Sequence, residues 1–253
     1  MSIADKQTVK NQYVTSEKLE TRISIHDKYS RNKEPFGDWI AQHYHLQPGE
    51  QVLELGCGTG SMWRNIALPQ GCSLTLTDLS PGMLSTAKLN TTHLGAAYAV
   101  CDAMALPWAD ESFDVVIANM MLYHVPDIDK ALGEIRRVLR KGGRFYAATF
   151  GEHGAVEAVL GMLGLPCTAN HRFTLQNGAA QLNRFFSQAD IFQRPDALDI
   201  TNLDDLIAYL HSMQGMTALA DIPDEHLRNV FISQMKDGVL SLPKEYGLFL
   251  CRR

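Results

Sequence analysis

The stretch Gln51–Ser61, with the sequence QVLELGCGTGS, decides the fold that this chain adopts. Its first half is apolar and predicts a short buried strand, and its second half is a loop with three glycines, Gly56, Gly58 and Gly60. Because glycine has no Cβ atom, such a loop turns sharply and lets a ligand lie against the main chain. We expect a helix to begin at about Met62, directly after the loop.

The residues around this loop distinguish between classes of ligand. A dinucleotide-binding loop has its third glycine where this chain has Ser61, and a phosphate-binding P-loop needs a Gly-Lys-Ser/Thr ending that this loop lacks. Glu54, just before the loop, is unfavourable beside a pyrophosphate and favourable beside a cation. S-adenosylmethionine (SAM) carries a sulfonium and an α-ammonium group and has no phosphate. The loop therefore favours SAM.

Acidic residues end or follow the next two predicted strands. The segment 73–78 alternates apolar and β-branched residues and ends on Asp78, at the point where a doubly wound fold hydrogen-bonds ribose hydroxyls. A Ser-Pro pair then predicts the start of a helix over 80–93. A third strand, over 96–100, runs into a turn that contains Asp102.

The chain continues with a fourth strand over 113–119 and a loop that contains His124. An amphipathic helix over 128–139 follows and stops at Lys141-Gly142-Gly143, before a fifth strand over 144–150. Motifs are fewer beyond this point. There we expect helices over 154–163, 174–186, 204–216 and 223–237, and strands over 191–200 and 246–252.

The order and spacing of these motifs resemble those of the class I (Rossmann-like) SAM-dependent methyltransferases. Residues 54–60 are similar to their motif I, E/D-x-G-x-G-x-G, and residues 78–84 are similar to their motif II. The run LPWADESFDVVIANMMLYHV, at 106–125, resembles the corresponding pattern of small-molecule methyltransferases. The resemblance covers roughly residues 50–150. It implies an α/β fold with a doubly wound, seven-stranded, mostly parallel sheet and helices on both faces.

The resemblance also implies which residues hold the cofactor. Asp78 would bind the ribose hydroxyls, and Asp102 would accept a hydrogen bond from the amino group of adenine. Glu54 would belong to the cofactor shell through a water molecule, or would be a buried structural carboxylate. We expect SAM as cofactor, S-adenosylhomocysteine (SAH) as product, and no metal. The other expected cofactor contacts are Gly56, Cys57, Gly58, Gly60, Leu79, Met83, Ala103, Asn119 and Met120.

Three residues are candidates for catalytic work on the methyl acceptor: His124, His26 and Tyr29. His124 follows the fourth strand, at the mouth where an acceptor should lie, and would act as a general base or orient the acceptor. The alternative is a contact to the cofactor or a role in a capped turn. Methyl transfer from an activated donor is an in-line displacement, so positioning without a base is sufficient. The same alternatives apply to the other two residues.

Residues 1–47 precede the nucleotide fold and predict two helices. The first covers 16–29 and has one apolar face, and the second begins at Pro35 and buries Phe36, Trp39 and Ile40. We expect this segment to form a helical lid over the carboxyl ends of the strands. Residues 48–253 would form the SAM-binding domain, with an insertion at about 151–186 that completes the lid.

Composition limits the classes of function. With 253 residues, 45% of them hydrophobic, the chain is long enough for one sizeable core. A net charge of −5 argues against a protein that clamps nucleic acid. The five cysteines include no C-x-x-C pair and predict free thiols in a reducing cytoplasm. No run approaches the about 18 apolar residues of a membrane span, so we expect a cytoplasmic monomer or homodimer without membrane contact.

Together these features predict an enzyme that transfers a methyl group from SAM to an O, N or C nucleophile of a small-molecule metabolite. An RNA or protein methyltransferase is an alternative. The charge balance disfavours it, and so does the sequence after the fourth strand, which lacks the N/D-P-P-Y/F signature of amino-group methylation. A non-catalytic SAM-binding regulator and a SAM-using isomerase or cyclase that never releases the methyl group are further alternatives.

Overall fold

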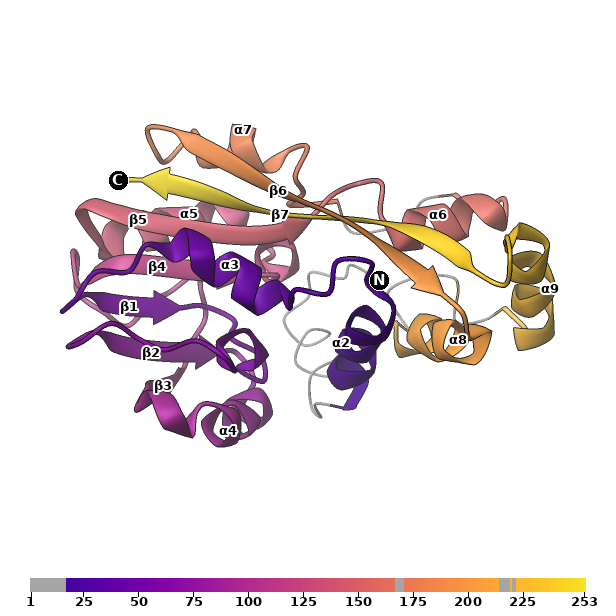
Figure 1. The fold of residues 1–253 in the computed structure, drawn as a ribbon. Helices are drawn as coiled ribbons and strands as arrows, with labels where there is room; N and C mark the ends of the chain where they lie inside the picture. Colours follow the sequence, from indigo (N-terminus) through magenta and orange to yellow (C-terminus); the bar gives the residue numbers. More distant parts are fainter. Residues whose placement is uncertain (1–16, 167–170, 214–218, 220–221) are drawn as a thin grey trace.

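The computed structural model describes residues 17–166, 171–213, 219 and 222–253. Its strands are β1 (Gln51–Glu54), β2 (Ser73–Asp78), β3 (Ala97–Val100), β4 (Phe113–Asn119), β5 (Leu139–Phe150), β6 (Ala189–Ile200) and β7 (Leu240–Arg252). Within the described residues they form one seven-stranded sheet, in the order β3-β2-β1-β4-β5-β7-β6 (Figure 1). The first five run parallel, and β7 lies antiparallel between β5 and β6. The predicted doubly wound, mostly parallel sheet is confirmed.

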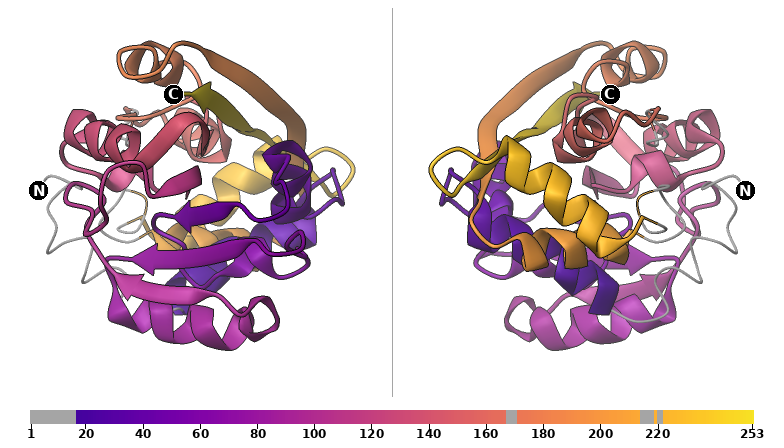
Figure 2. Two further views of the ribbon diagram at one scale, coloured as in Figure 1. Left: turned by 90° about the vertical axis from the view of Figure 1, so that its left-hand side faces the viewer. Right: turned by 90° about the vertical axis from the view of Figure 1, so that its right-hand side faces the viewer.

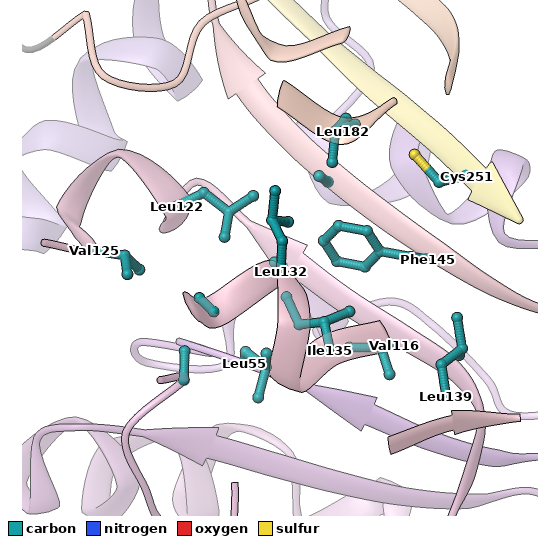
Figure 3. Packing of buried hydrophobic residues seen from close by; sticks show 14 of the residues in the cluster. Leu55, Val116, Leu122, Val125, Leu132, Ile135, Leu139, Phe145, Leu182 and Cys251 are labelled. Atoms are coloured by element: carbon teal, nitrogen blue, oxygen red, sulfur yellow. The ribbon is translucent and has the colours of Figure 1, made fainter. Parts of the chain in front are cut away.

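One face of the sheet is covered by α5 (Ile128–Val138) and α7 (Gly178–Leu182). The N-cap of α5 is Asp127, whose carboxylate accepts a hydrogen bond from the backbone N–H of Lys130 at 3.0 Å. The apolar stripe of α5 packs on β4 and β5, as the side chains of Leu132, Ile135, Val116 and Phe145 show in Figure 3. Full burial of each such side chain contributes about 1.5–3 kcal/mol, which fixes α5 on the sheet.

The opposite face is covered by α3 (Phe36–Tyr44) and α4 (Pro81–Asn90). Ser80 is the N-cap of α4, and its hydroxyl accepts a hydrogen bond from the Met83 N–H at 3.3 Å. Because both faces of the sheet are covered, β4 is buried along almost its whole length. The buried residues of this second cluster include Ile40, Tyr44, Val52, Trp63, Leu76, Leu84, Ile117 and Tyr146.

A third cluster lies beyond the end of β5. Phe150, the last residue of β5, pairs with Tyr246, and β6 and β7 continue past this point as a two-stranded ribbon. The ribbon packs with α2 (Glu17–Tyr29), α6 (Ala155–Met162), α8 (Leu203–Ser212) and α9 (Asp224–Gln234). We call the ribbon and these four helices the cap. Figure 1 shows the cap beside the sheet, with α8 between α2 and α9, and the right-hand view of Figure 2 looks onto the cap from the side of α9.

The segment expected to form one lid, residues 1–47, is divided between two clusters. The part of it that precedes residue 17 lies outside the described residues. Ile25 of α2 is buried in the cap cluster, whereas Tyr44 of α3 is buried against the sheet. Of the described part of this segment, α2 and the chain that links it to α3 therefore lie on the cap side of the molecule.

The prediction of a helix from about Met62 is wrong. In its place the chain forms a single 3₁₀ turn, Ser61–Trp63, and then runs irregularly to β2. Pro69 disfavours helical geometry in the residue before it, and Gly71 has a φ of +75°. Too few residues remain before the proline for a stable helix.

Other boundaries also differ from the predictions. The helix over 128–139 ends at Val138, and Lys141–Gly143 belong to an irregular start of β5 where the register with β4 shifts. Of the helix over 174–186 only α7 forms; it is preceded by a capping turn in which the Thr174 N–H donates to the Asn177 side chain at 2.9 Å and the Asn177 N–H donates to the Thr174 hydroxyl at 3.3 Å. β7 begins at Leu240 rather than 246. Pro243 is tolerated within this strand because β5 pairs only with residues 246–252, so no β5 carbonyl requires a hydrogen bond from position 243.

Candidate functional site

A cavity of about 720 Å³ lies between the carboxyl ends of the strands and the cap. Its sheet side consists of the glycine loop after β1 and the segments that follow β2, β3 and β4. Its cap side consists of α2 and the chain after it, the start of α6, the end of α8 and the ribbon part of β7. The cavity therefore has a wall from each of the two parts of the molecule.

The glycine loop is held open by backbone geometry. Gly56, Gly58 and Gly60 all have positive φ, at +65°, +55° and +72°. A Cβ atom on Gly56 would lie 2.8 Å from the Cβ of Met121, so no side chain fits there. Gly60 does not line the cavity: a Cβ at this position would lie 2.9 Å from a methyl group of Thr91. The structure places Gly60 against the end of α4.

Asp78 ends β2 and faces this loop. Its Oδ2 accepts a hydrogen bond from the Gly58 N–H at 2.9 Å, and its Oδ1 accepts one from the Ser80 N–H at 2.8 Å. Burial raises the pKa of Asp78, and these backbone donors work in the opposite direction. The carboxylate oxygens have more lone pairs than these backbone donors use, so the fixed carboxylate can also accept hydrogen bonds from neighbouring hydroxyls.

Glu54 is buried and also lines the cavity. Its carboxylate accepts hydrogen bonds from Nε1 of Trp63 and from Nδ2 of Asn119, the second at 2.8 Å. Asn119 Nδ2 also donates to the hydroxyl of Tyr44 at 2.8 Å, and its Oδ1 is buried without a hydrogen bond to any described residue. Burial is the main cause that raises the pKa of Glu54 to about 7. No sequence motif indicated Trp63 or Tyr44 as partners of this carboxylate.

The remaining predicted cofactor contacts line the same cavity: Cys57, Leu79, Met83, Asp102, Ala103 and Met120. Asp102 forms a turn in which its Oδ1 accepts the Met104 N–H at 3.0 Å. Met120 has a φ of +52°, and its N–H donates to the Ala148 carbonyl at 2.9 Å. A left-handed residue other than glycine costs on the order of 1–2 kcal/mol. Backbone strain of this kind is typical of functional sites.

His124 and His26 face the cavity from opposite walls, the first from the loop after β4 and the second from α2. Burial lowers the pKa of His124 to about 4, and burial followed by the Lys244 charge lowers that of His26 to about 3. Both are therefore neutral near pH 7. Tyr29, the third catalytic candidate, does not line the cavity, because its hydroxyl donates to Asp205 of α8 at 2.6 Å. It joins α2 to α8 instead.

Several cavity residues come from segments in which the sequence offered no motif. They line the cap side of the cavity and include Arg22, Glu157, Tyr209, Met213, Lys244 and Tyr246. Their common position depends on the ribbon and the cap helices, which bring together residues more than 200 positions apart, such as Arg22 and Lys244. No local pattern could have identified them.

Other expectations concern residues outside this cavity. The described cysteines Cys57, Cys72, Cys101 and Cys251 are free thiols, and Cys167 lies outside the described residues. In the part of the chain that the structure describes, no group of three or more His, Cys, Asp or Glu could hold a metal ion. No described helix has both the length and the apolar character that crossing a membrane requires.

Comparison with known proteins identifies the sheet region. Residues 53–147 match the family model described as "Methyltransferase domain". The methyltransferase GfsG of Streptomyces halstedii is 30% identical over 137 residues, which cover 53% of this chain and 49% of that protein. The ubiquinone/menaquinone biosynthesis C-methyltransferase UbiE of Stenotrophomonas maltophilia is 38% identical over 113 residues, 42% of this chain and 45% of that protein. The chain thus matches about half the length of these curated relatives.

Solved structures extend the likeness of fold to the cap. The [4+2]-cyclase SpnF has a TM-score of 0.63 with 20% identity, over 98% of this chain and 96% of its own. A phosphoethanolamine N-methyltransferase 2 of Haemonchus contortus has a TM-score of 0.61 with 19% identity, over 100% of this chain and 61% of its own. At these identities the likeness concerns the fold alone. The match over residues 53–147, which hold most of the parallel strands of this sheet, identifies a methyltransferase domain in this chain.

Proposed function

We propose that this chain is an enzyme that transfers a methyl group from SAM to an O, N or C nucleophile of a small-molecule metabolite. The observation that carries the proposal is the carboxylate of Asp78, held by two backbone N–H groups beside an open glycine loop. That loop opens into a cavity with a second, cap-side wall for an acceptor. The names of the relatives GfsG and UbiE support methyl transfer, and that of UbiE supports a metabolite acceptor.

The residues on the sheet side of the cavity fit SAM. Asp78 has the unused lone pairs that a ribose diol requires, and Gly56 leaves the space that a side chain would fill. The orphaned Oδ1 of Asn119 is an acceptor for an ammonium group, and the nearby carboxylate of Glu54 favours a cation. Asp102 would accept from the adenine amino group. The Haemonchus contortus structure, described as a complex with SAH, supports this choice of cofactor.

Bound SAM would supply an activated methyl group, so that the acceptor forms a bond to this carbon while the carbon–sulfur electron pair returns to sulfur, leaving SAH. The protein would contribute position and exclusion of water, which are large terms for an in-line displacement. His124 and His26 have pKa values of about 4 and about 3, so they would orient the acceptor through neutral hydrogen bonds rather than store its proton. The cap would close the acceptor side of the cavity.

The size of the cavity supports a small acceptor. At about 720 Å³ it is in the range of cavities that hold a small molecule, about 300–1,000 Å³. The test of the proposal is release of SAH when the protein is supplied with SAM and candidate metabolites, followed by mass spectrometry of the methylated product. A protein that binds SAM and releases no SAH with any metabolite would be a regulator, or an enzyme that retains the methyl group. SAH release only with RNA or protein would identify the macromolecular alternative.

Asp78→Ala should weaken binding of SAM and SAH by at least about tenfold. The variant removes hydrogen bonds to an ionised acceptor, each worth about 1.5–3 kcal/mol. Isothermal titration calorimetry with SAH measures the change, and Asp129→Ala is the control, since Asp129 is an exposed partner of Arg184 outside the cavity. SAH affinity that stays the same in both variants would overturn the cofactor assignment.

Binding of SAM should release protons from Glu54. Because its pKa is raised to about 7, roughly half of the Glu54 carboxyl groups are protonated at pH 7. The positive charge of SAM favours the ionised form and lowers this pKa, so up to about half a proton leaves per SAM bound. SAH lacks the sulfonium charge and should release fewer protons. Calorimetry in buffers of different ionisation enthalpy counts the protons, and equal release by Glu54→Gln would contradict the assignment.

A further inference from the structure

The cap side of the cavity surrounds one imidazole with aromatic rings. His26 of α2 packs edge-on against Tyr246 of β7, with ring centres 5.5 Å apart, and against Tyr209 of α8, at 6.0 Å. Tyr123 and Phe150, whose rings are 4.6 Å apart, line the same cavity from the sheet side. α2, α8 and the ribbon part of β7 meet in the cap, as Figure 1 shows. Three distant segments of the chain therefore fix the position of His26.

The two ring nitrogens of His26 differ in their surroundings. Nε2 lies 3.1 Å from the hydroxyl oxygen of Tyr246, within hydrogen-bond distance. Nδ1 is buried and has no hydrogen-bond partner among the described residues. A buried polar atom without a partner costs about 1–3 kcal/mol. Since His26 lines the cavity, a ligand in that cavity would supply the missing partner.

The contact with Tyr246 determines which nitrogen carries the hydrogen. His26 is neutral, so one ring nitrogen donates and the other accepts. The Tyr246 hydroxyl makes its one described hydrogen bond to Nε2, and donation in this direction leaves the hydrogen of the imidazole on Nδ1. The reverse direction would leave both the phenol hydrogen and Nδ1 without a partner. The arrangement with fewer unpaired groups therefore presents an N–H donor at Nδ1.

The charges that act on His26 favour an oxygen that carries negative charge, because there Lys244 and Arg194 together outweigh Asp196. The ammonium of Lys244 lies 5.1 Å from the centre of the Tyr246 ring. Lys244 and Arg194 share one carboxylate, that of Asp196, at 2.9 and 2.7 Å, so this buried group has one positive charge in excess. Asp27 is also near Lys244 but is exposed, so water screens its charge.

We propose that His26 selects the acceptor, by donating a hydrogen bond from Nδ1 to a carbonyl or oxyanion oxygen on a planar, ring-bearing molecule held among the tyrosines of the cap side. This inference rests on the proposed function and narrows it, because it names the chemical class of the acceptor. Tyr246 is the positioning residue, which fixes the tautomer of His26. A purely apolar acceptor would leave the Nδ1–H group unpaired, so the site should bind such acceptors more weakly than acceptors that carry an oxygen.

The first test is the tautomer of His26, measured by ¹⁵N NMR of protein labelled at histidine. We expect the Nδ1–H form of His26 in the wild type, with its signal assigned by its loss in His26→Asn. In Tyr246→Phe the phenol hydrogen is gone, and a large share of His26 should change to the Nε2–H form. A wild-type His26 that already carries its hydrogen on Nε2 would overturn the proposal. This measurement needs neither SAM nor turnover, so its result is independent of the proposed function.

The second test compares two probes of similar shape, acetophenone and isopropylbenzene, in protein saturated with SAH. Acetophenone should bind about fivefold more tightly and shift the His26 Nδ1–H resonance, because only this probe has an oxygen to accept the hydrogen bond. His26→Phe should remove the preference, and His26→Asn, whose amide nitrogen lies near the original Nδ1, should keep part of it. Equal loss of both probes in His26→Phe would indicate a merely structural residue and would overturn the proposal. Failure of SAH itself to bind would instead contradict the proposed function.

Discussion

Asp196→Ala is expected to lower the free energy of unfolding by about 3–5 kcal/mol, because it leaves two buried cations without their counter-ion. The Asp196 side chain is fully buried and accepts hydrogen bonds from Arg194 at 2.7 Å and Lys244 at 2.9 Å. It also accepts the backbone N–H of Asn32 at 2.9 Å, and Lys244 donates to the hydroxyl of Ser30 at 2.6 Å. The carboxylate thus ties the chain between α2 and α3 to the ribbon, and its loss should loosen the cap.

Asp199→Ala is the matched control, since Asp199 lies on the same strand and pairs with the exposed guanidinium of Arg31. An exposed pair contributes about 0–1 kcal/mol, so urea denaturation should separate the two variants clearly. Equal destabilisation would show that burial of the charges is not the cause.

The dependence of the free energy of unfolding on pH in the acidic range gives a second test. Burial alone would raise the pKa of Asp196, but hydrogen bonds from the Asn32 N–H and from Lys244 outweigh it and lower that pKa to about 2. A carboxyl whose pKa is lowered by folding stabilises the protein above its unfolded value of about 3.9. This stabilisation is lost as the pH falls through the folded value. Asp196→Ala should therefore lose less stability than the wild type between about pH 4 and pH 2.

Trp63→Ala should also cost about 3–5 kcal/mol, and it should weaken binding of SAH. A single 3₁₀ turn follows the glycine loop, and the indole of Trp63 in this turn is fully buried. Its ring lies 5.9 Å from that of Tyr44, and its Nε1 donates to Glu54. The alanine variant leaves both a cavity and a buried carboxylate with one donor fewer, next to the loop that would hold the cofactor.

Two comparisons separate these effects. Trp63→Phe keeps most of the ring volume and loses the N–H, so we expect a smaller loss, about 1–3 kcal/mol. Trp108→Ala removes a tryptophan that is only partly buried, against Phe113 at 5.4 Å, and it should leave SAH affinity unchanged. Thermal unfolding and calorimetry with SAH measure both quantities. A loss in Trp63→Ala no larger than that in Trp108→Ala would contradict the role of the indole.

The features that the sequence predicted correctly depend on short-range backbone geometry. Left-handed glycines after an apolar strand predict an open loop, and the structure has them at Gly56 and Gly58. An acidic residue at the end of the second strand predicts a group beside that loop, and Asp78 contacts the loop directly. Gly60 has the same conformation, but only the position of α4 reveals that it packs against Thr91.

The features that the sequence did not predict depend on contacts between distant segments. The cap cluster joins Ile25, Leu206 and Phe231, which come from three different helices. The apolar pattern of each helix predicts that one face is buried but does not indicate which helix packs against it. Tyr29 was a catalytic candidate because it is an aromatic hydroxyl in an expected lid, and only the position of Asp205 shows that it joins two helices. The helix expected after the glycine loop does not form, and the reason is local. Pro69 disfavours helical geometry in the residue before it, and the prediction did not take this proline into account.

The place of β7 in the sheet has a consequence for the order in which the chain folds. β7 follows every other strand in the sequence, yet it lies between β5 and β6 and contributes Lys244 to the ion cluster. Until its 13 residues have left the ribosome, β5 has an unpaired edge, and β6 lacks its neighbour. Pairings over such long sequence separations form slowly, and an exposed strand edge invites association with other chains. We therefore expect the parallel strands to form early, and commitment to the native state, cap included, to wait for the synthesis of β7.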